Sequence, residues 1–180
     1  MRVITGSAHG KKLITPEGLD VRPTVARVKE AVFSSLQFDI EGRNILDLFA
    51  GSGQLGIESL SRGAKHCTFV DNSKVSLKAV KQNLANCKLE NSATIVEKDS
   101  FSFIKTANET FDIAFLDPPY NKGIINEIMP LLVEKMSDFG IIVCEYANKG
   151  ELLDCYGDFH LKKTVKYGNI FISYYKKRED

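Results

Sequence analysis

The stretch NILDLFAGSGQLGIESLSRG, residues 44–63, decides the fold. It opens with a short apolar run, Ile45–Phe49, which predicts a strand. A glycine turn, Gly51–Gly53, follows directly, and the amphipathic run Gln54–Arg62 then predicts a helix that Gly63 ends. A strand, a tight turn and a helix in this order form the first part of a unit that returns to a parallel strand.

Downstream of this stretch the same alternation continues. Further strands are predicted over Cys67–Val70, Ala93–Val96, Phe111–Leu116 and Gly140–Cys144, and further helices over Ser73–Cys87 and Ile124–Met136. The end of the chain differs, because His160–Tyr167 and Ile170–Tyr175 alternate around Gly168-Asn169 and predict an antiparallel hairpin. We therefore expect a doubly wound α/β domain with helices on both faces of its sheet.

A small extension is expected before this domain. Arg2–Thr5 and Lys11–Thr15 are two short alternating pieces around a turn, which predicts a hairpin. Thr24 is the expected N-cap of a helix over Val25–Leu36.

Composition sets outer limits on function. The 180 residues carry a net charge of +1, which argues against a protein that coats nucleic acid without selectivity. No apolar run is long enough to span a membrane and no secretory signal follows Met1, so we expect a cytoplasmic protein without membrane contact. The scattered cysteines and histidines have no metal-ligand spacing, and we expect no metal and free, buried thiols.

Acidic residues recur at or just past the predicted strand ends. They are Asp47, Asp71, Asp99 and Asp117. Because ligands of open α/β sheets bind outside the carboxyl ends of the strands, we expect these carboxylates to surround one site.

The glycine loop and its acid indicate the kind of ligand. Gly51–Gly56 fits G-x-G-x-x-G, a weak signal alone, but Asp47 precedes it at the strand end. A carboxylate there is unsuited to a pyrophosphate and favours a cationic ligand, such as one with a sulfonium and an amino group.

Asp71 lies about 20 residues further on, where an acid binds ribose hydroxyls, although a role at the helix N-terminus near Ser73 is the alternative. Asp99 is placed to bind an adenine amino group or, alternatively, to cap a helix. Together these acids predict a binding site for S-adenosylmethionine (SAM).

Asp117-Pro118-Pro119-Tyr120 is the most specific feature of the sequence. A diproline continues neither a helix nor a sheet ladder, so it makes a stiff turn at the strand end. The Asp117 side chain and the Pro118 carbonyl are then free to accept both hydrogens of an aromatic amine, with its lone pair facing a methyl donor. Tyr120 offers a flat face on which a base can stack. The alternative is a proline-terminated strand with a buried tyrosine.

These residues together resemble the class I SAM-dependent methyltransferases that carry a D/N-P-P-Y motif, and more closely the RsmD family. The closer resemblance rests on Arg2–Gly6, Lys11–Leu13, Arg22–Thr24 with Arg27, Asp47–Gly53, Leu60–Ala64 and Tyr167-Gly168. That family methylates the 2-amino group of one guanine in the small-subunit (16S) ribosomal RNA. The resemblance implies a Rossmann-like class I methyltransferase fold with a seven-stranded, mostly parallel sheet and an antiparallel C-terminal hairpin.

The resemblance also assigns roles to residues. The implied cofactor residues are Asp47, Phe49, Gly51, Gly53, Asp71, Asn72, Asp99 and Ser100, and the implied catalytic residues are Asp117, Pro118 and Tyr120. The implied RNA contacts are Arg2, Lys11, Lys12, Arg22, Thr24 and Arg27. Where the family often has an acid before that last arginine, Ala26 stands here. Further basic residues near the end form a phosphate-binding rim if they meet the first group in space; they are Lys162, Lys163, Lys166, Lys176, Lys177 and Arg178.

The expected organisation is thus an N-terminal hairpin and helix extension over residues 1–40 and a SAM-binding catalytic domain over residues 41–180. We expect a monomer that acts on ribosomal RNA in the small subunit or its assembly intermediates, with S-adenosylhomocysteine as the product.

Three other functions stay open. An adenine or cytosine amino-methyltransferase acting on DNA or RNA would use the same chemistry, but the short chain leaves no sizeable target-recognition region for DNA. A protein-glutamine methyltransferase usually has Asn rather than Asp at the position of Asp117. A non-catalytic nucleotide-binding module has no use for a rigid amine-directed turn.

Overall fold

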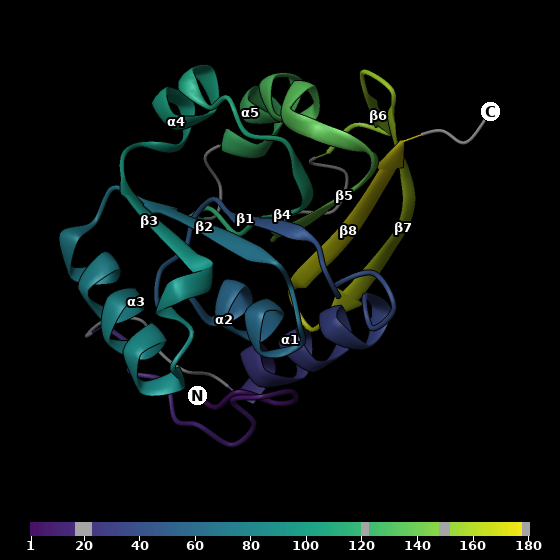
Figure 1. Ribbon diagram of the computed structural model, residues 1–180. Helices are drawn as coiled ribbons and strands as arrows, with labels where there is room; N and C mark the ends of the chain where they lie inside the picture. The colour runs from purple at the N-terminus through teal and green to yellow at the C-terminus, as the bar shows by residue number, and fades with distance from the viewer. Residues whose placement is uncertain (17–22, 120–122, 148–151, 178–180) are drawn as a thin grey trace.

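One mixed sheet organises the chain in the computed structural model (Figure 1). Its eight strands lie in the order β3-β2-β1-β4-β5-β8-β7-β6. They are β1 (Asn44–Asp47), β2 (His66–Asp71), β3 (Ala93–Glu97), β4 (Phe111–Leu116), β5 (Met136–Tyr146), β6 (Cys155–Tyr156), β7 (Phe159–Tyr167) and β8 (Ile170–Lys177). β3, β2, β1, β4 and β5 pair in parallel, and β8, β7 and β6 add an antiparallel end. The α/β prediction is confirmed.

The structure describes residues 1–16, 23–119, 123–147 and 152–177, and only the backbone of residues 23–25. The helices are α1 (Pro23–Ser35), α2 (Gln54–Ser61), α3 (Lys74–Cys87), α4 (Ser100–Thr106) and α5 (Ile124–Leu132), with short 3-10 turns at Glu90–Ser92 and Val133–Lys135. Figure 1 shows α1, α2 and α3 on one face of the sheet and α4 and α5 on the other. None of the described helices has the length and apolar character needed to cross a membrane.

Alternate strand residues face the two helical layers. On β1, Ile45 belongs to the hydrophobic cluster under α1–α3, and Leu46 belongs to the cluster under α4 and α5. On β4, Phe115 and Leu116 divide in the same way. Burial on both faces explains why these strands read as continuous apolar runs. It also leaves the strand ends as the places where polar side chains collect.

The sheet has one strand more than the seven expected. The extra strand, β6, consists of Cys155 and Tyr156 and pairs antiparallel with β7. A two-residue strand is too short to show alternation in the sequence. Cys155 is exposed on it, whereas the other three cysteines are buried as expected.

Three element boundaries also differ from the expectation. The N-terminal hairpin is reduced to a single antiparallel bridge between Arg2 and Lys12. Helix α1 begins at Pro23, so Thr24 lies in its first turn and is not the N-cap; a proline is favourable there because that N–H has no helical partner to lose. Helix α5 ends at Leu132, because the chain turns there into the strand that Met136 begins.

Glu58, a fully buried residue of α2, anchors the N-terminal segment. Its carboxylate accepts the Ile4 N–H at 2.8 Å and the Thr5 N–H at 3.0 Å. The same carboxylate pairs with Lys29 Nζ at 3.0 Å and with Arg62 Nε at 2.9 Å. Burial lowers the pKa of Lys29, and the charge of Glu58 opposes this shift. Two cations and two amides thus surround one buried carboxylate, which is the arrangement that a buried charge requires.

A second buried side chain joins the same segment to the glycine loop. Asn83 Nδ2 donates to the carbonyls of Ile14 at 2.8 Å and Ser52 at 2.9 Å. Asn83 Oδ1 accepts the Ile14 N–H at 2.7 Å. The first 16 residues are therefore positioned by polar contacts with α2 and α3 as well as by apolar packing.

Replacing Glu58 by alanine is expected to lower the free energy of unfolding by about 3–5 kcal/mol, because Lys29 would remain as a buried, unpaired charge. Urea denaturation measures this loss. The matched control is Glu97→Ala, which removes an exposed ion pair with Lys74 and is expected to cost less than about 1 kcal/mol. Similar losses in the two variants would contradict the anchoring role.

Candidate functional site

Asp47 supports the glycine loop from beneath. Gly51 and Gly53 adopt φ values of 52° and 76°, and the second of them precedes α2 without any side chain to cap the helix. Asp47 Oδ2 takes over that role by accepting the Gly56 N–H at 3.0 Å. Burial, aided by the charge of Asp71, raises the pKa of Asp47 to about 7. The contact of this carboxylate with a cationic ligand stays a prediction.

Asp71 binds the loop from the end of β2. Its Oδ2 accepts the Gly51 N–H at 2.9 Å and its Oδ1 accepts the Ser73 N–H at 2.8 Å. The N-cap of α3 is Ser73 itself, whose Oγ accepts from Ser76 N. Because each carboxylate oxygen has a second lone pair, Asp71 keeps acceptor sites for ribose hydroxyls.

Asp99 has a structural role that the sequence left as an alternative. It is the N-cap of α4, and its Oδ1 accepts the Ser102 N–H at 2.9 Å. Hydrogen bonds from the Ser102 side chain and from its backbone N–H hold the pKa of the exposed Asp99 carboxyl below its ordinary value. The capping interpretation is confirmed, while adenine binding stays a prediction.

Three other predicted cofactor residues lie at the same edge of the sheet. Asn72 is exposed directly after β2, and Ser100 is the first residue of α4. Phe49 follows β1, half-buried against the cluster under α4 and α5.

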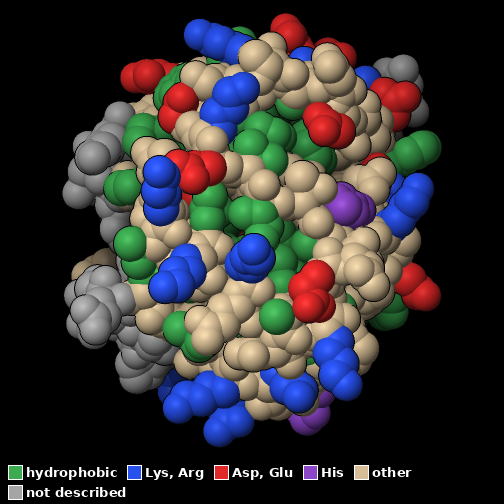
Figure 2. Space-filling model, turned by 60° about the vertical axis from the view of Figure 1, so that its left-hand side comes forward, with side chains coloured by type: hydrophobic (Ala, Val, Ile, Leu, Met, Phe, Trp, Pro, Cys, Tyr) green, Lys and Arg blue, Asp and Glu red, His purple; other side chains and the backbone are tan. Residues whose placement is uncertain are grey.

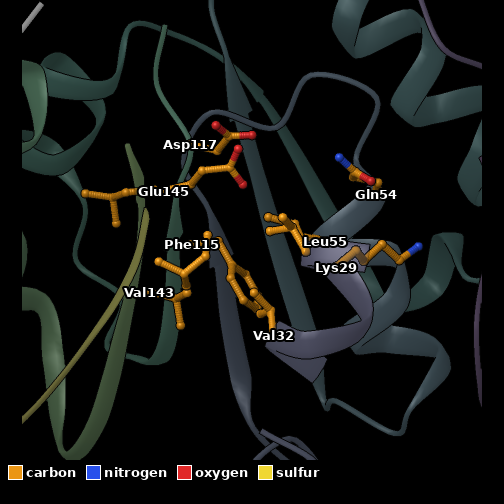
Figure 3. Close-up of a pocket in the computed structure, with 11 residues that line it drawn as sticks. Lys29, Val32, Gln54, Leu55, Phe115, Asp117, Val143 and Glu145 are labelled. Carbon is orange, nitrogen blue, oxygen red and sulfur yellow. The ribbon is translucent and has the colours of Figure 1, made fainter. Parts of the chain in front are cut away.

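The carboxyl ends of β4 and β5 bring two acids together. Leu116 pairs with Cys144, so the next residues, Asp117 and Glu145, are neighbours. Figure 3 shows both carboxylates pointing to the same side of the site, across from Gln54. Glu145 was not among the predicted site residues, although it directly follows the predicted strand Gly140–Cys144 and so carries the same signal as Asp117.

A pocket opens in front of these two acids. Its wall combines α1, the start of α2 and the ends of β4, β5 and β8 (Figure 3). The lining residues are Val28, Lys29, Val32, Gln54, Leu55, Phe115, Leu116, Asp117, Val143, Glu145 and Ile172. Pro118, the residue after Asp117, is buried, whereas Tyr120 lies outside the described residues.

The electrostatics of the pocket are acidic. Burial and the nearby charges of Glu145 and Asp47 raise the pKa of Asp117 well above its ordinary value. Within the described ranges, no salt bridge reaches Asp47, Asp71 or Asp117. Lys29 lines the pocket, but its ammonium is bound to Glu58 and to the Arg2 carbonyl. The site is therefore suited to ligands that bring positive charge and hydrogen-bond donors. No cluster of three potential metal ligands occurs among the described residues.

The predicted RNA contacts lie on the N-terminal segment and α1. Arg2, Lys11, Lys12 and Arg27 are exposed, and the Arg2 guanidinium donates to the Gly10 carbonyl at 2.9 Å. Arg22 and the Thr24 side chain lie outside the described part of the chain. Lysine and arginine side chains gather along the lower rim of the face in Figure 2, where Figure 1 places the N-terminal segment and α3. Helix α3 also carries exposed lysines that were not among the predicted RNA contacts, namely Lys74, Lys78 and Lys81.

The basic residues near the end of the chain contact their own surroundings. Lys163 donates to Ser35, and Lys166 lies over the ring of Phe171. Lys176 and Lys177 pair with Asp39 and Asp138. These four belong to the β7–β8 edge, whereas the N-terminal segment lies beneath α1–α3 (Figure 1). The predicted joint rim is therefore not supported.

The chain is similar to known proteins over nearly its whole length. The family described as "Conserved hypothetical protein 95" matches residues 1–176. The chain is 39% identical over 183 residues to "Putative rRNA methyltransferase YlbH" of Bacillus subtilis, covering 99% of this chain and 100% of that protein. It is 31% identical to "Ribosomal RNA small subunit methyltransferase D" of Escherichia coli K12, covering 98% and 90% of the two chains. The solved structure of "Putative methyltransferase yhhF" from Escherichia coli superimposes with a TM-score of 0.90, at 31% identity, over 100% of this chain and 99% of that one.

The raised pKa of Asp47 predicts how stability depends on pH. The folded chain holds the Asp47 proton with a pKa of about 7, against 3.8 for an unperturbed aspartate, so folding is favoured when this group is protonated. The Asp47 contribution is therefore fully present below about pH 4 and is lost as the pH rises to about 7.

Asp47→Asn keeps an oxygen for the Gly56 N–H and is expected to remove that loss. Denaturation of the protein without added ligand, at about pH 5 and about pH 8, measures the difference, with Asp158→Asn on the exposed surface as the control. Parallel pH profiles for wild type and Asp47→Asn would contradict the burial argument.

Proposed function

Because the chain belongs to the conserved hypothetical protein 95 family, the RsmD family of methyltransferases, we propose that it methylates ribosomal RNA. The methyl donor is SAM, and the acceptor is the exocyclic 2-amino group of one guanine in the small-subunit RNA. The extension over residues 1–40 helps to hold the RNA, and residues 41–180 form the SAM-binding catalytic domain.

The observation that carries this proposal is the position of Asp117 and Pro118. They leave the sheet at the end of β4, at the same edge as Asp47 and Asp71, and Asp117 faces a pocket. A methyl donor bound over the glycine loop and an amine bound against Asp117 would lie beside each other there. Such an arrangement supports direct transfer between two bound partners.

The residues at the ends of β1 and β2 fit SAM. Asp47 is a buried carboxylate without an ion pair among the described residues, so a sulfonium or ammonium nearby would compensate its charge. Asp71 would accept hydrogen bonds from the ribose, and Gly51 and Gly53 would allow the ligand to lie against the backbone. Phe49, Asn72, Asp99 and Ser100 would surround the adenosine. When bound, SAM supplies the methyl group on its sulfonium sulfur.

Asp117 and the Pro118 carbonyl would hold the target amine. Two acceptors fix both N–H bonds and turn the nitrogen lone pair towards the methyl group. As the new N–C bond forms and the S–C bond breaks, the amine loses one proton. That proton is already hydrogen-bonded to the Asp117 carboxylate, whose raised pKa favours accepting it. Tyr120 would stack on the extruded base.

The names of the most similar relatives reported above support RNA as the substrate. The names of two relatives that cover nearly the whole chain specify rRNA or small-subunit ribosomal RNA methylation. An adenine or cytosine methyltransferase would place its amine in the same way, so guanine rests on the resemblance to the RsmD family. A non-catalytic binding module is disfavoured by the Asp117-Pro118-Pro119-Tyr120 motif, because binding alone has no use for a rigid amine-directed turn.

Mass spectrometry of small-subunit ribosomal RNA tests the reaction in cells. A deletion strain is expected to lack one N2-methylguanine that the wild-type chain restores. Asp117→Ala is expected to lower the rate of restoration by about a hundredfold or more, because one pre-positioned acceptor of the amine is lost. The exposed control Asp138→Ala is expected to restore the nucleoside fully. A complete methylation pattern in the deletion strain would refute the proposed reaction.

Replacing Asp71 by alanine is expected to weaken SAM binding by about tenfold or more, because hydrogen bonds to a charged group contribute about 1.5–3 kcal/mol. Titration calorimetry measures the affinity, and a thermal melt checks that the loop still folds after losing its contact with Gly51. Asp117→Ala should change the same affinity by only a few-fold. Unchanged binding by Asp71→Ala would remove this residue from the ribose site.

A further inference from the structure

We propose that Glu145 is the residue that selects guanine, by accepting the N1–H of the target base while Asp117 and Pro118 hold its 2-amino group. This inference rests on the proposed function, because it assigns a role within the same pocket. It concerns which bases the site accepts, whereas the proposed function concerns the chemistry.

Strand register places Glu145 where this role requires it. β4 and β5 are parallel neighbours with Phe115 opposite Val143 and Leu116 opposite Cys144. Glu145 therefore lies beside Asp117, one strand spacing away, which is about 4.8 Å. Both side chains line the pocket, and Figure 3 shows their carboxylates directed to the same side. Adjacent donors on the edge of a purine base are about half that far apart, so two converging carboxylates can reach both.

The pocket wall offers acceptors and few donors. Gln54 Oε1, across from the two acids, is buried without a hydrogen-bond partner among the described residues. Lys29, the cation of the wall, has its ammonium on Glu58 and points away from the acids in Figure 3. A buried acceptor such as Gln54 Oε1 needs a donor, and two neighbouring carboxylates repel each other. The charge of Glu145 is one of the causes that raise the pKa of Asp117.

Guanine is the base whose edge meets this requirement. Its Watson–Crick edge presents the N1–H and both hydrogens of the 2-amino group, three donors in a row. Adenine and cytosine each present an amino group beside an unprotonated ring nitrogen, which would face a carboxylate with its lone pair. A carboxylate oxygen that faces an unprotonated ring nitrogen leaves both acceptors without a donor, which is strongly disfavoured in a buried site. Asp117 alone cannot make this distinction, because all three bases carry an exocyclic amine.

The test uses 2-aminopurine, which keeps the 2-amino group of guanine but has no hydrogen on N1. Small subunits are reconstituted from RNA with guanine or 2-aminopurine at the position that mass spectrometry identifies, and methyl transfer is measured as kcat/KM. The wild-type chain is expected to prefer guanine by about a hundredfold, in the range by which sites built to bind a donor reject analogues that lack it.

Glu145→Gln is expected to reduce turnover on guanine by about tenfold or more and to narrow the preference to within about tenfold, since its amide N–H can donate to the bare N1. The matched control is Glu90→Gln, an exposed residue before β3, which should keep both the rate and the preference. SAM affinity and the thermal melt of Glu145→Gln should stay close to wild type.

Two results would overturn the proposal while leaving the methyltransferase function intact. One is an unchanged preference in Glu145→Gln, and the other is an equal loss of rate on both substrates, which indicates a structural role. A wild-type chain that methylates neither substrate would refute the proposed function and this inference with it.

Discussion

The close approach of α2 to the sheet is the constraint on which the rest of the structure depends. A side chain at Gly56 would bring its Cβ to 2.3 Å from the Phe69 ring and 2.6 Å from Cys67 Sγ, so the helix can lie here only with glycine at this position. The same residue donates its N–H to Asp47. Two residues further on, Glu58 enters the core and binds the N-terminal segment. One helix therefore fixes the glycine loop, the acid beneath it and the extension.

This arrangement places several carboxylates at the carboxyl edge of the sheet, and none of Asp47, Asp71 and Asp117 has a salt bridge within the described ranges. Burial raises the pKa of both Asp47 and Asp117, and the charge of Asp47 contributes to the raised pKa of Asp117. Lys29 also lines the pocket, but its ammonium is bound to Glu58 and to the Arg2 carbonyl rather than to these acids. Negative charge on these carboxylates is therefore unfavourable in the protein without ligand. A cationic methyl donor and an amine that donates N–H hydrogen bonds would stabilise it. Ligand binding and pKa are two descriptions of the same electrostatics.

The positions of strands and helices could be predicted from the sequence where a short-range pattern of apolar and polar residues determines the structure. β4 occupies the predicted residues, Phe111–Leu116, because alternating burial on two faces leaves a continuous apolar run with sharp polar ends. Asp71 and Asp117 were found because strand ends gather at one edge. Glu145 was missed although it follows a predicted strand in the same way as Asp117. Glu58 was missed because its partners Ile4, Thr5 and Lys29 are distant in the chain. β6 was missed for a related reason, since its pairing with β7 and not its own sequence makes it a strand.

The N-terminal segment is bonded to a residue of the pocket wall, and on the proposed function this contact would link recognition of the RNA to recognition of the base. Lys29 lines the pocket, binds Glu58 and donates to the carbonyl of Arg2, one of the exposed residues expected to meet RNA. Buried polar bonds therefore set the position of the basic segment relative to Asp117. With a net charge of only +1, the chain gains little from general attraction to RNA. On the proposed function, selection of one guanine would depend on fixed distances between weak surface contacts and the pocket that Asp117 and Glu145 line.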